Sequence, residues 1–143
     1  MGAILVHEFA TLDGVIEAPT WTFDFGFDPK MGESIKELTD RSRAILLGRK
    51  TYEMFEPAWS TRTEEDDPGA PFFNDTQEYV VSSTLTEPTW RNSSILGAYD
   101  PEAIRRLKAR LFREDSEPLK LSLDAAEPYA NGAVHLAYTG AKG

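Results

Sequence analysis

Residues that could bind phosphate stand together near the first third of the chain. Gly48, Arg49, Lys50 and Thr51 directly follow the apolar run of residues 44–47. A buried strand that ends at a glycine and leads into a helix presents backbone N–H groups at the helix start, and the two cations add charge. This tetrad predicts a phosphate-binding turn. The alternative is an ordinary strand-to-helix turn that carries a solvated basic pair.

Hydroxyl side chains follow a second apolar run. Residues 77–83 have the composition of a strand, and Ser82, Ser83 and Thr84 stand at its end. The carboxyl ends of adjacent parallel strands lie at one edge of a sheet, so these hydroxyls and the basic pair are expected close together. Hydroxyl, backbone and cationic donors are what a phosphate monoester needs. Alternatively, the two serines form hydrogen bonds within their own turn.

Apolar spacing and turn-forming residues predict the elements that position these groups. Strands are expected at residues 3–10, 44–47, 77–83 and 93–96, and helices beginning at Pro29, near Arg49 and at Pro101. Asp28 and Asp100 are expected to cap the first and third helices. A terminal hairpin is expected over residues 119–138, with its turn at Asn131 and Gly132.

Proline and charge set further boundaries. The helix that begins near Arg49 should stop before Pro57, because the residue before a proline disfavours helical geometry. The acidic residues 60–75 should form a solvated, mobile loop, and their consecutive carboxylates point apart and make a poor metal site. Residues 17–27 hold aromatic side chains without helical spacing, so they either cap the edge of a core or close over a flat ligand or partner.

The order of these elements determines the expected fold class. Strands that alternate with helices and end in a hairpin predict an α/β three-layer sandwich with a mostly parallel central sheet and a C-terminal antiparallel hairpin. A chain of 143 residues fits a single domain over residues 1–143.

The composition excludes several classes of partner and site. A formal net charge of -9 and a pI near 4.7 argue against nucleic acid and anionic membranes as partners. The chain has no cysteine, and His7 and His135 are its only histidines, so no metal site is expected. The first residues lack a basic segment and no apolar run approaches the length of a membrane span, so we expect a soluble, cytoplasmic protein.

Three segments, in this order, resemble the dihydrofolate reductase-like superfamily. They are residues 7–16 (HEFATLDGVI), 46–53 (LLGRKTYE) and 79–85 (YVVSSTL). More narrowly, they resemble the riboflavin-biosynthesis deaminase-reductase (RibD) C-terminal domain family. Residues 119–121 and 132–136 are similar to the last hairpin of that family.

The resemblance implies an NADPH-dependent reductase that transfers hydride to a small heteroaromatic substrate, pyrimidine- or pterin-like. It implies that the glycine-arginine turn holds cofactor phosphates, that the strand-end hydroxyls hold the adenosine-side phosphate, and that the loop after the first strand lies over the nicotinamide. The cofactor-binding residues implied in this way are Ala10, Asp13, Gly14, Ile16, Gly48, Arg49, Lys50, Thr51, Ser82, Ser83 and Thr84.

No catalytic acid is assigned from the sequence. Hydride transfer needs mostly the positioning of donor against acceptor. Reductases of the folate type add a carboxylate on the first helix, where this chain offers Asp28, Glu33 and Glu37. Asp28 is explained as the helix cap and the two glutamates as a solvated face, and Asp13 has a turn role that needs no chemistry.

One part of the family pattern is missing from this chain. Residues 107–109 run directly into residues 110–112, which resemble a segment that comes much later in the family's sequences. Two central strands and the glycine phosphate loop of the family are therefore absent after about residue 108. In the family those strands flank the first strand, whose unpaired buried backbone groups would each cost about 1–3 kcal/mol. Either the sheet closes up, or a homodimer supplies the missing edges, or the sequence omits a segment of the full protein. The alternative to an active reductase is therefore a catalytically impaired reductase-like module that binds or dimerises.

Overall fold

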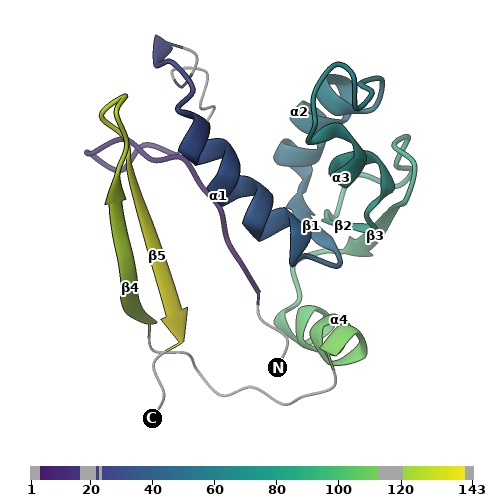
Figure 1. Cartoon of the computed structure of the whole chain (residues 1–143). Helices are drawn as coiled ribbons and strands as arrows, with labels where there is room; N and C mark the ends of the chain where they lie inside the picture. The colour runs from purple at the N-terminus through teal and green to yellow at the C-terminus, as the bar shows by residue number, and fades with distance from the viewer. Residues whose placement is uncertain (1–3, 17–21, 23, 113–120, 141–143) are drawn as a thin grey trace. The chain divides into compact units, whose positions relative to one another are not determined.

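The chain forms two compact units (Figure 1). The structure is a computed structural model that describes residues 4–16, 22, 24–112 and 121–140. Within these residues, the first unit comprises residues 39–112, and the second comprises residues up to 38 together with 121–140. Each unit is described by itself.

The first unit is built on a three-stranded parallel sheet. Its strands are β1 (Ile45–Gly48), β2 (Glu78–Val81) and β3 (Ser93–Gly97), in the spatial order β1-β2-β3. The register pairs Leu47 with Val80 and Gly48 with Val81, so β1 and β2 end side by side. This confirms that the two strands in front of the basic tetrad and the hydroxyls are adjacent and parallel.

The core of the first unit lies on one face of this sheet. Leu47 and Val80 are buried there against Tyr52 and Trp90, which are each 3% exposed. Apolar side chains that surround this cluster are Ile45, Phe55, Trp59, Phe73, Leu85 and Ile95. Since β-strand side chains alternate between faces, the short strands contribute every second residue to this core.

Helices α2 (Arg49–Trp59), α3 (Ala70–Asp75) and α4 (Pro101–Phe112) belong to the same unit. The start of α2 at Arg49 is confirmed, whereas the predicted end before Pro57 is wrong. The helix continues through Pro57, and the N–H of Ser60 still donates to the carbonyl of Glu56 at 2.9 Å. The continuation is stabilised by Trp59, whose ring stacks on Phe73 at 4.4 Å between centroids.

Helix α3 lies in the stretch that was expected to be a loop. Residues 60–69 are turns and irregular backbone, but Ala70–Asp75 is helical, so the prediction for residues 60–75 is wrong over its second half. Ala70 is fully buried and the Phe73 ring meets the rings of Phe55 and Trp59. These tertiary contacts stabilise a helix too short for an apolar period to be recognised in the sequence.

Helix α1 (Pro29–Asp40), which lies in the second unit up to Leu38, begins as predicted. The Oδ1 atom of Asp28 accepts the backbone N–H of Lys30 at 2.9 Å, and its Oδ2 accepts the N–H of Ala130 at 2.9 Å. Asp28 therefore caps the helix and also fastens the turn of the terminal hairpin. Tyr129 extends this contact, because its hydroxyl lies 3.0 Å from Oγ of Ser34.

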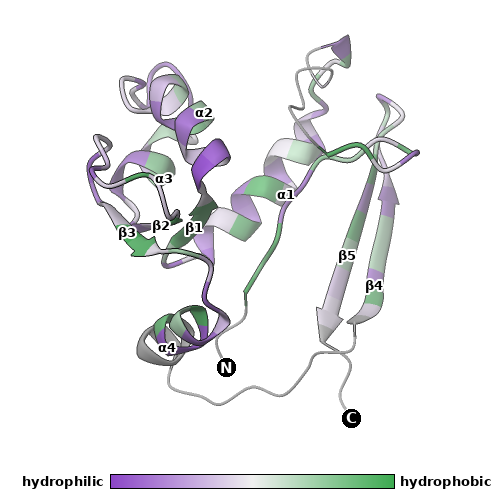
Figure 2. Ribbon diagram, turned by 180° about the vertical axis from the view of Figure 1, so that it is seen from behind, coloured by the Kyte–Doolittle hydropathy of each residue, from purple (hydrophilic) through white to green (hydrophobic). Residues whose placement is uncertain are grey.

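The terminal hairpin is confirmed, with β4 (Leu121–Pro128) and β5 (Val134–Gly140) paired in antiparallel fashion. Its turn contains Gly132 at φ 87, a left-handed conformation that glycine adopts at little cost. Leu123, Val134, Leu136 and Tyr138 are each about half exposed, and Figure 2 shows hydrophobic residues along both strands of this hairpin.

The predicted strand at residues 3–10 is wrong over the residues that the structure describes. Residues 4–10 pair with no strand, and Val6 is 81% exposed. Ala3 lies outside the described residues. A strand needs partners for its backbone groups, and the apolar composition of this segment cannot supply them alone.

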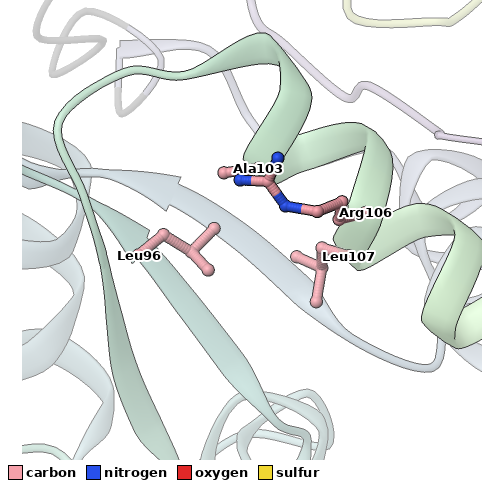
Figure 3. A pocket seen from close by; sticks show the side chains of 4 residues that line it. All are labelled: Leu96, Ala103, Arg106 and Leu107. Atoms are coloured by element: carbon pink, nitrogen blue, oxygen red, sulfur yellow. The ribbon is translucent and has the colours of Figure 1, made fainter.

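The fold class is confirmed as α/β, with a parallel sheet and a C-terminal antiparallel hairpin. Leu96 lies on the opposite side of β3 from Ile95, and α4 lies on that side, with Ala103, Arg106 and Leu107 across a hollow from Leu96 (Figure 3). Among the described residues, no helix is long and apolar enough to cross a membrane.

Candidate functional site

The turn between β1 and α2 has an open helix start. Gly48 precedes α2 with φ -80 and ψ 160, and as the N-cap residue it gives the first helical N–H groups no side-chain hydrogen bond. An added Cβ at Gly48 would meet no atom within 4 Å. The φ and ψ of Gly48 are values that any residue adopts, so the turn does not require glycine for its conformation. The absence of a side chain leaves room for a ligand beside the backbone.

The side chains of this turn are accessible. Gly48, Arg49 and Lys50 are exposed and Thr51 is partly buried. Helix α2 has eleven residues, long enough for its dipole to place positive potential at this end. An anion at the turn would meet backbone N–H groups and two cationic side chains together.

Arg49 has an internal partner that the sequence interpretation missed. Its Nη1 atom donates to both carboxylate oxygens of Glu53, at 2.8 and 2.9 Å. The two residues are spaced i, i+4 on α2, the spacing at which helix side chains meet, so the pattern could have predicted the pair. Because the side chains are 43% and 48% exposed, the pair contributes little stability and a phosphate can share or displace it.

The strand-end hydroxyls lie beside this turn. Gly48 and Val81 are register partners at the ends of β1 and β2, and these two strands run about 4.8 Å apart. Arg49 directly follows β1, and Ser82 directly follows β2. Ser83 and Thr84 are exposed. The structure thus brings the basic tetrad and the hydroxyl segment to the same edge of the sheet.

Ser82 itself is used inside the turn. It is 7% exposed, and its Oγ accepts the N–H of Thr84 at 3.1 Å and of Leu85 at 2.8 Å. Its own N–H donates to the carbonyl of Gly97 at 2.8 Å. The alternative interpretation from the sequence, a serine that bonds within its own turn, therefore describes Ser82. Ser83 and Thr84 are exposed, and the Thr84 hydroxyl lies 3.5 Å from Oγ of Ser82.

A shallow hollow lies next to the hydroxyl segment, between β3 and α4 (Figure 3). It has a volume of about 360 Å³ and is lined by Leu96, Ala103, Arg106 and Leu107. Leu96 immediately precedes Gly97, the residue that accepts the N–H of Ser82. The lining is mostly apolar with one guanidinium, which suits a flat ring with polar edges.

The loop predicted to lie over the nicotinamide, which follows residues 3–10, belongs to the second unit. Thr11 accepts the N–H of Gly14 at its carbonyl (2.9 Å), and its Oγ1 donates to Oδ1 of Asp13 at 2.5 Å. Gly14 has φ 87, so the predicted turn and the turn role of Asp13 are confirmed. Ala10, Asp13, Gly14 and Ile16 are exposed. Their assignment to the nicotinamide stays a prediction.

Glu78 is a buried carboxylate that the sequence analysis did not single out. It is 0% exposed, its Oε2 accepts the hydroxyl of Ser93 at 2.5 Å, and its Oε1 has no hydrogen-bond partner among the described residues. Burial raises the pKa of Glu78 to about 7, against the opposing effect of the Ser93 hydrogen bond. It stands at the amino end of β2, opposite the candidate site, and is therefore a structural group.

The carboxylates considered on the first helix take no part in an obvious acid–base site. Both oxygens of Asp28 accept backbone N–H groups, while Glu33 and Glu37 are exposed. In the same unit, burial and the charge of His135 lower the pKa of His7. Within the part of the chain that the structure describes, no three His, Cys, Asp or Glu side chains are grouped to hold a metal ion.

Comparison with known proteins identifies the family. The family model described as RibD C-terminal domain matches residues 3–127, which includes both segments at the sheet edge. A comparison with the curated proteins gives no match. The chain therefore belongs to the RibD C-terminal domain family, a family of dihydrofolate reductase-like enzymes that generally use NADPH.

Proposed function

We propose that this chain is an NADPH-dependent reductase that transfers hydride to a small heteroaromatic substrate of the pyrimidine or pterin kind. The observation that carries the proposal is the register of Gly48 with Val81, which sets an open, basic helix start beside exposed hydroxyls. One nucleotide that bears several phosphates can contact both segments at once.

The residues present fit the phosphate groups of NADPH. Gly48, Arg49, Lys50 and Thr51 would hold phosphate through backbone N–H groups and side-chain donors. Ser83 and Thr84 would hold the 2′-phosphate with their hydroxyls. The hollow lined by Leu96, Ala103, Arg106 and Leu107 is the proposed place for the adenine ring, because Leu96 precedes Gly97, whose carbonyl binds the N–H of Ser82.

When bound, NADPH supplies the hydride, and the chain's own residues orient it. We assign the contact with the nicotinamide to Ala10, Asp13, Gly14 and Ile16, on the family resemblance. No carboxylate is assigned as proton donor, since Asp28 is committed to two backbone N–H groups. Solvent is the proposed proton source for reduction of the substrate, as hydride transfer depends chiefly on positioning.

Titration of the purified protein with NADPH tests the proposal. Enhanced and blue-shifted nicotinamide fluorescence, saturating in the micromolar range, is expected. No change at high micromolar NADPH would contradict it. NADPH oxidation in the presence of a set of pyrimidine and pterin substrates then tests turnover separately from binding.

A second function is favoured by one observation in the second unit. Among the described residues, no strand pairs with residues 4–10, and Ile4, Leu5 and Val6 are all more than 40% exposed, although this segment is the central strand in the family resemblance. We propose, as the alternative, a catalytically impaired module that forms a homodimer. Light scattering after size exclusion measures the mass. A dimer without NADPH oxidation supports this alternative, and a monomer that oxidises NADPH contradicts it.

A further inference from the structure

Tyr52 connects helix α2 to the segment that follows the strand-end hydroxyls. Its phenolic oxygen accepts two backbone N–H groups, those of Thr89 and Trp90, each at 2.9 Å. The side chain is 3% exposed. Tyr52 lies one helical turn after Arg49, so the same helix presents the basic turn at its start and holds residues 89–90 through its buried face.

Neighbouring contacts make this connection specific. Glu56, one turn further along α2, accepts the hydroxyl of Thr89 at 3.3 Å. The indole N–H of Trp90 donates to Oδ1 of Asn74 at 2.8 Å. Residues 89 and 90 are thus held by backbone and side chain, and their position relative to α2 is fixed at several atoms.

A short path leads from residue 89 back to the exposed hydroxyls. Ser82 closes the turn through its contacts with Thr84 and Leu85, and Leu85 packs against the core cluster. Only three residues lie between Leu85 and Thr89, and one of them is Pro88, whose ring restricts the backbone. The turn of residues 82–84 is therefore fastened at one end by β2 and at the other by Tyr52.

We propose that Tyr52 is a positioning residue that sets the spacing between the two phosphate-binding segments and thereby the preference for NADPH over NADH. This inference rests on the proposed function of the site. Only NADPH carries the 2′-phosphate assigned to Ser83 and Thr84, whereas both cofactors carry the diphosphate that the backbone N–H groups at the start of α2 would hold. Displacing the 82–84 turn should weaken NADPH selectively.

The test is the variant Tyr52→Phe, which removes the accepting oxygen and keeps the ring in the core. The dissociation constants of NADPH and NADH are measured by calorimetry at a temperature where the protein is fully folded. We expect the NADPH constant to rise about tenfold, the equivalent of roughly one lost hydrogen bond, and the NADH constant to change less than about twofold. Equal weakening of both cofactors, or of neither, would overturn the inference.

Ser93→Ala is the matched control. It removes one partly buried hydroxyl contact, that with Glu78, at the amino end of the same sheet. This variant should lower the melting temperature and leave the ratio of the two constants unchanged. If Ser93→Ala changes the ratio of the NADPH and NADH dissociation constants as much as Tyr52→Phe does, the change is a general effect of destabilisation. That result would overturn the positioning role of Tyr52.

Amide hydrogen exchange separates this inference from the function proposed for the site. In Tyr52→Phe, the amides of Thr84 and Leu85 should exchange faster by a larger factor than the amides of β2. If the wild-type protein binds neither NADPH nor NADH, the proposed function and the cofactor preference are both overturned. The amide exchange of Thr84 and Leu85 would still show whether Tyr52 positions the turn. Uniform exchange changes along 78–90 would overturn that role too.

Discussion

The indole of Trp90 donates its N–H to Oδ1 of Asn74 at 2.8 Å, in the buried interior of the first unit. The Nδ2 atom of the same amide donates to the carbonyls of Trp59 and Arg62, at 2.9 and 3.0 Å. Asn74 is 2% exposed. One side chain thus binds one buried indole N–H, from the segment before β3, and two partly buried carbonyls, from the last residue of α2 and from the residues after it.

Replacement of Asn74 should therefore destabilise the first unit strongly. Asn74→Ala leaves the indole N–H and two carbonyls without this partner, and we expect the free energy of unfolding to fall by about 2–4 kcal/mol. Urea denaturation followed by tryptophan fluorescence measures it. Asp75→Ala is the control, because its pair with Arg91 is more than 60% exposed and should contribute well under 1 kcal/mol. Equal effects of the two variants would contradict the role given to Asn74.

Glu78 should make the stability of the first unit depend on pH. Its pKa is raised from 4.5 to about 7 in the folded protein, so between these values the folded state keeps a proton that the unfolded state releases. The stability is fully present below pH 4.5, falls as the pH rises toward 7, and stays lower above it. The difference amounts to about 3 kcal/mol.

The variant Glu78→Gln isolates this contribution. The amide is neutral at every pH, so the decrease in unfolding free energy between pH 4.5 and 7.5 should be smaller in the variant than in the wild type. The carboxyls of Asp66 and Asp100 have lowered pKa values, so their protonation changes the stability only below about pH 4, outside this window. Parallel stability curves for variant and wild type would contradict the assignment.

Arg49 should contribute to NADPH binding more than to NADH binding, because a 2′-phosphate or a neighbouring phosphate loses a charge-assisted contact. In Arg49→Ala, the dissociation constant of NADPH should rise about tenfold or more. Arg62→Gln serves as the charge-matched control, since Arg62 lies after the far end of α2, over the Trp59 ring. Equal losses for both cofactors would place Arg49 elsewhere.

Asp28 should hold the second unit together at the junction of helix and hairpin. Asp28→Ala removes the cap of α1 and the acceptor for the N–H of Ala130, which should speed amide exchange at Lys30 and Ala130 together. Asp28→Asn retains one accepting oxygen and should protect one of the two amides. If exchange at Ala130 is unchanged in both variants, the hairpin is held by other contacts.

Local signals were sufficient for part of this fold. Asp28 before Pro29 and Asp100 before Pro101 mark helix starts with a capping oxygen and a fixed proline angle, and both caps are present. The parallel neighbours β1 and β2 could be predicted because each is a short apolar run followed by residues that stop a strand. The site at the sheet edge follows from that adjacency.

Features that depend on distant contacts could not be predicted in this way. Pro57 does not end α2, because the stacking of Trp59 on Phe73 stabilises the last turn. Residues 4–10 have the composition of a strand but no partner in the described chain. The burial of Glu78 depends on its register opposite Ser93, which no local pattern encodes.

The irregular register of β3 has a consequence for its tolerance of sequence change. The partners of Val80 and Val81 are Ile95 and Gly97, so Leu96 is an extra residue, and Gly97 closes the irregularity at φ 86. Leu96 lies on the α4 side of the strand and Ile95 on the core side, and the added residue makes Gly97 the partner of Val81. A deletion or insertion of one residue after Ile95 would shift the register of the residues that follow and break the pairing of Gly97 with Val81, whereas a change of residue type alters only side-chain volume.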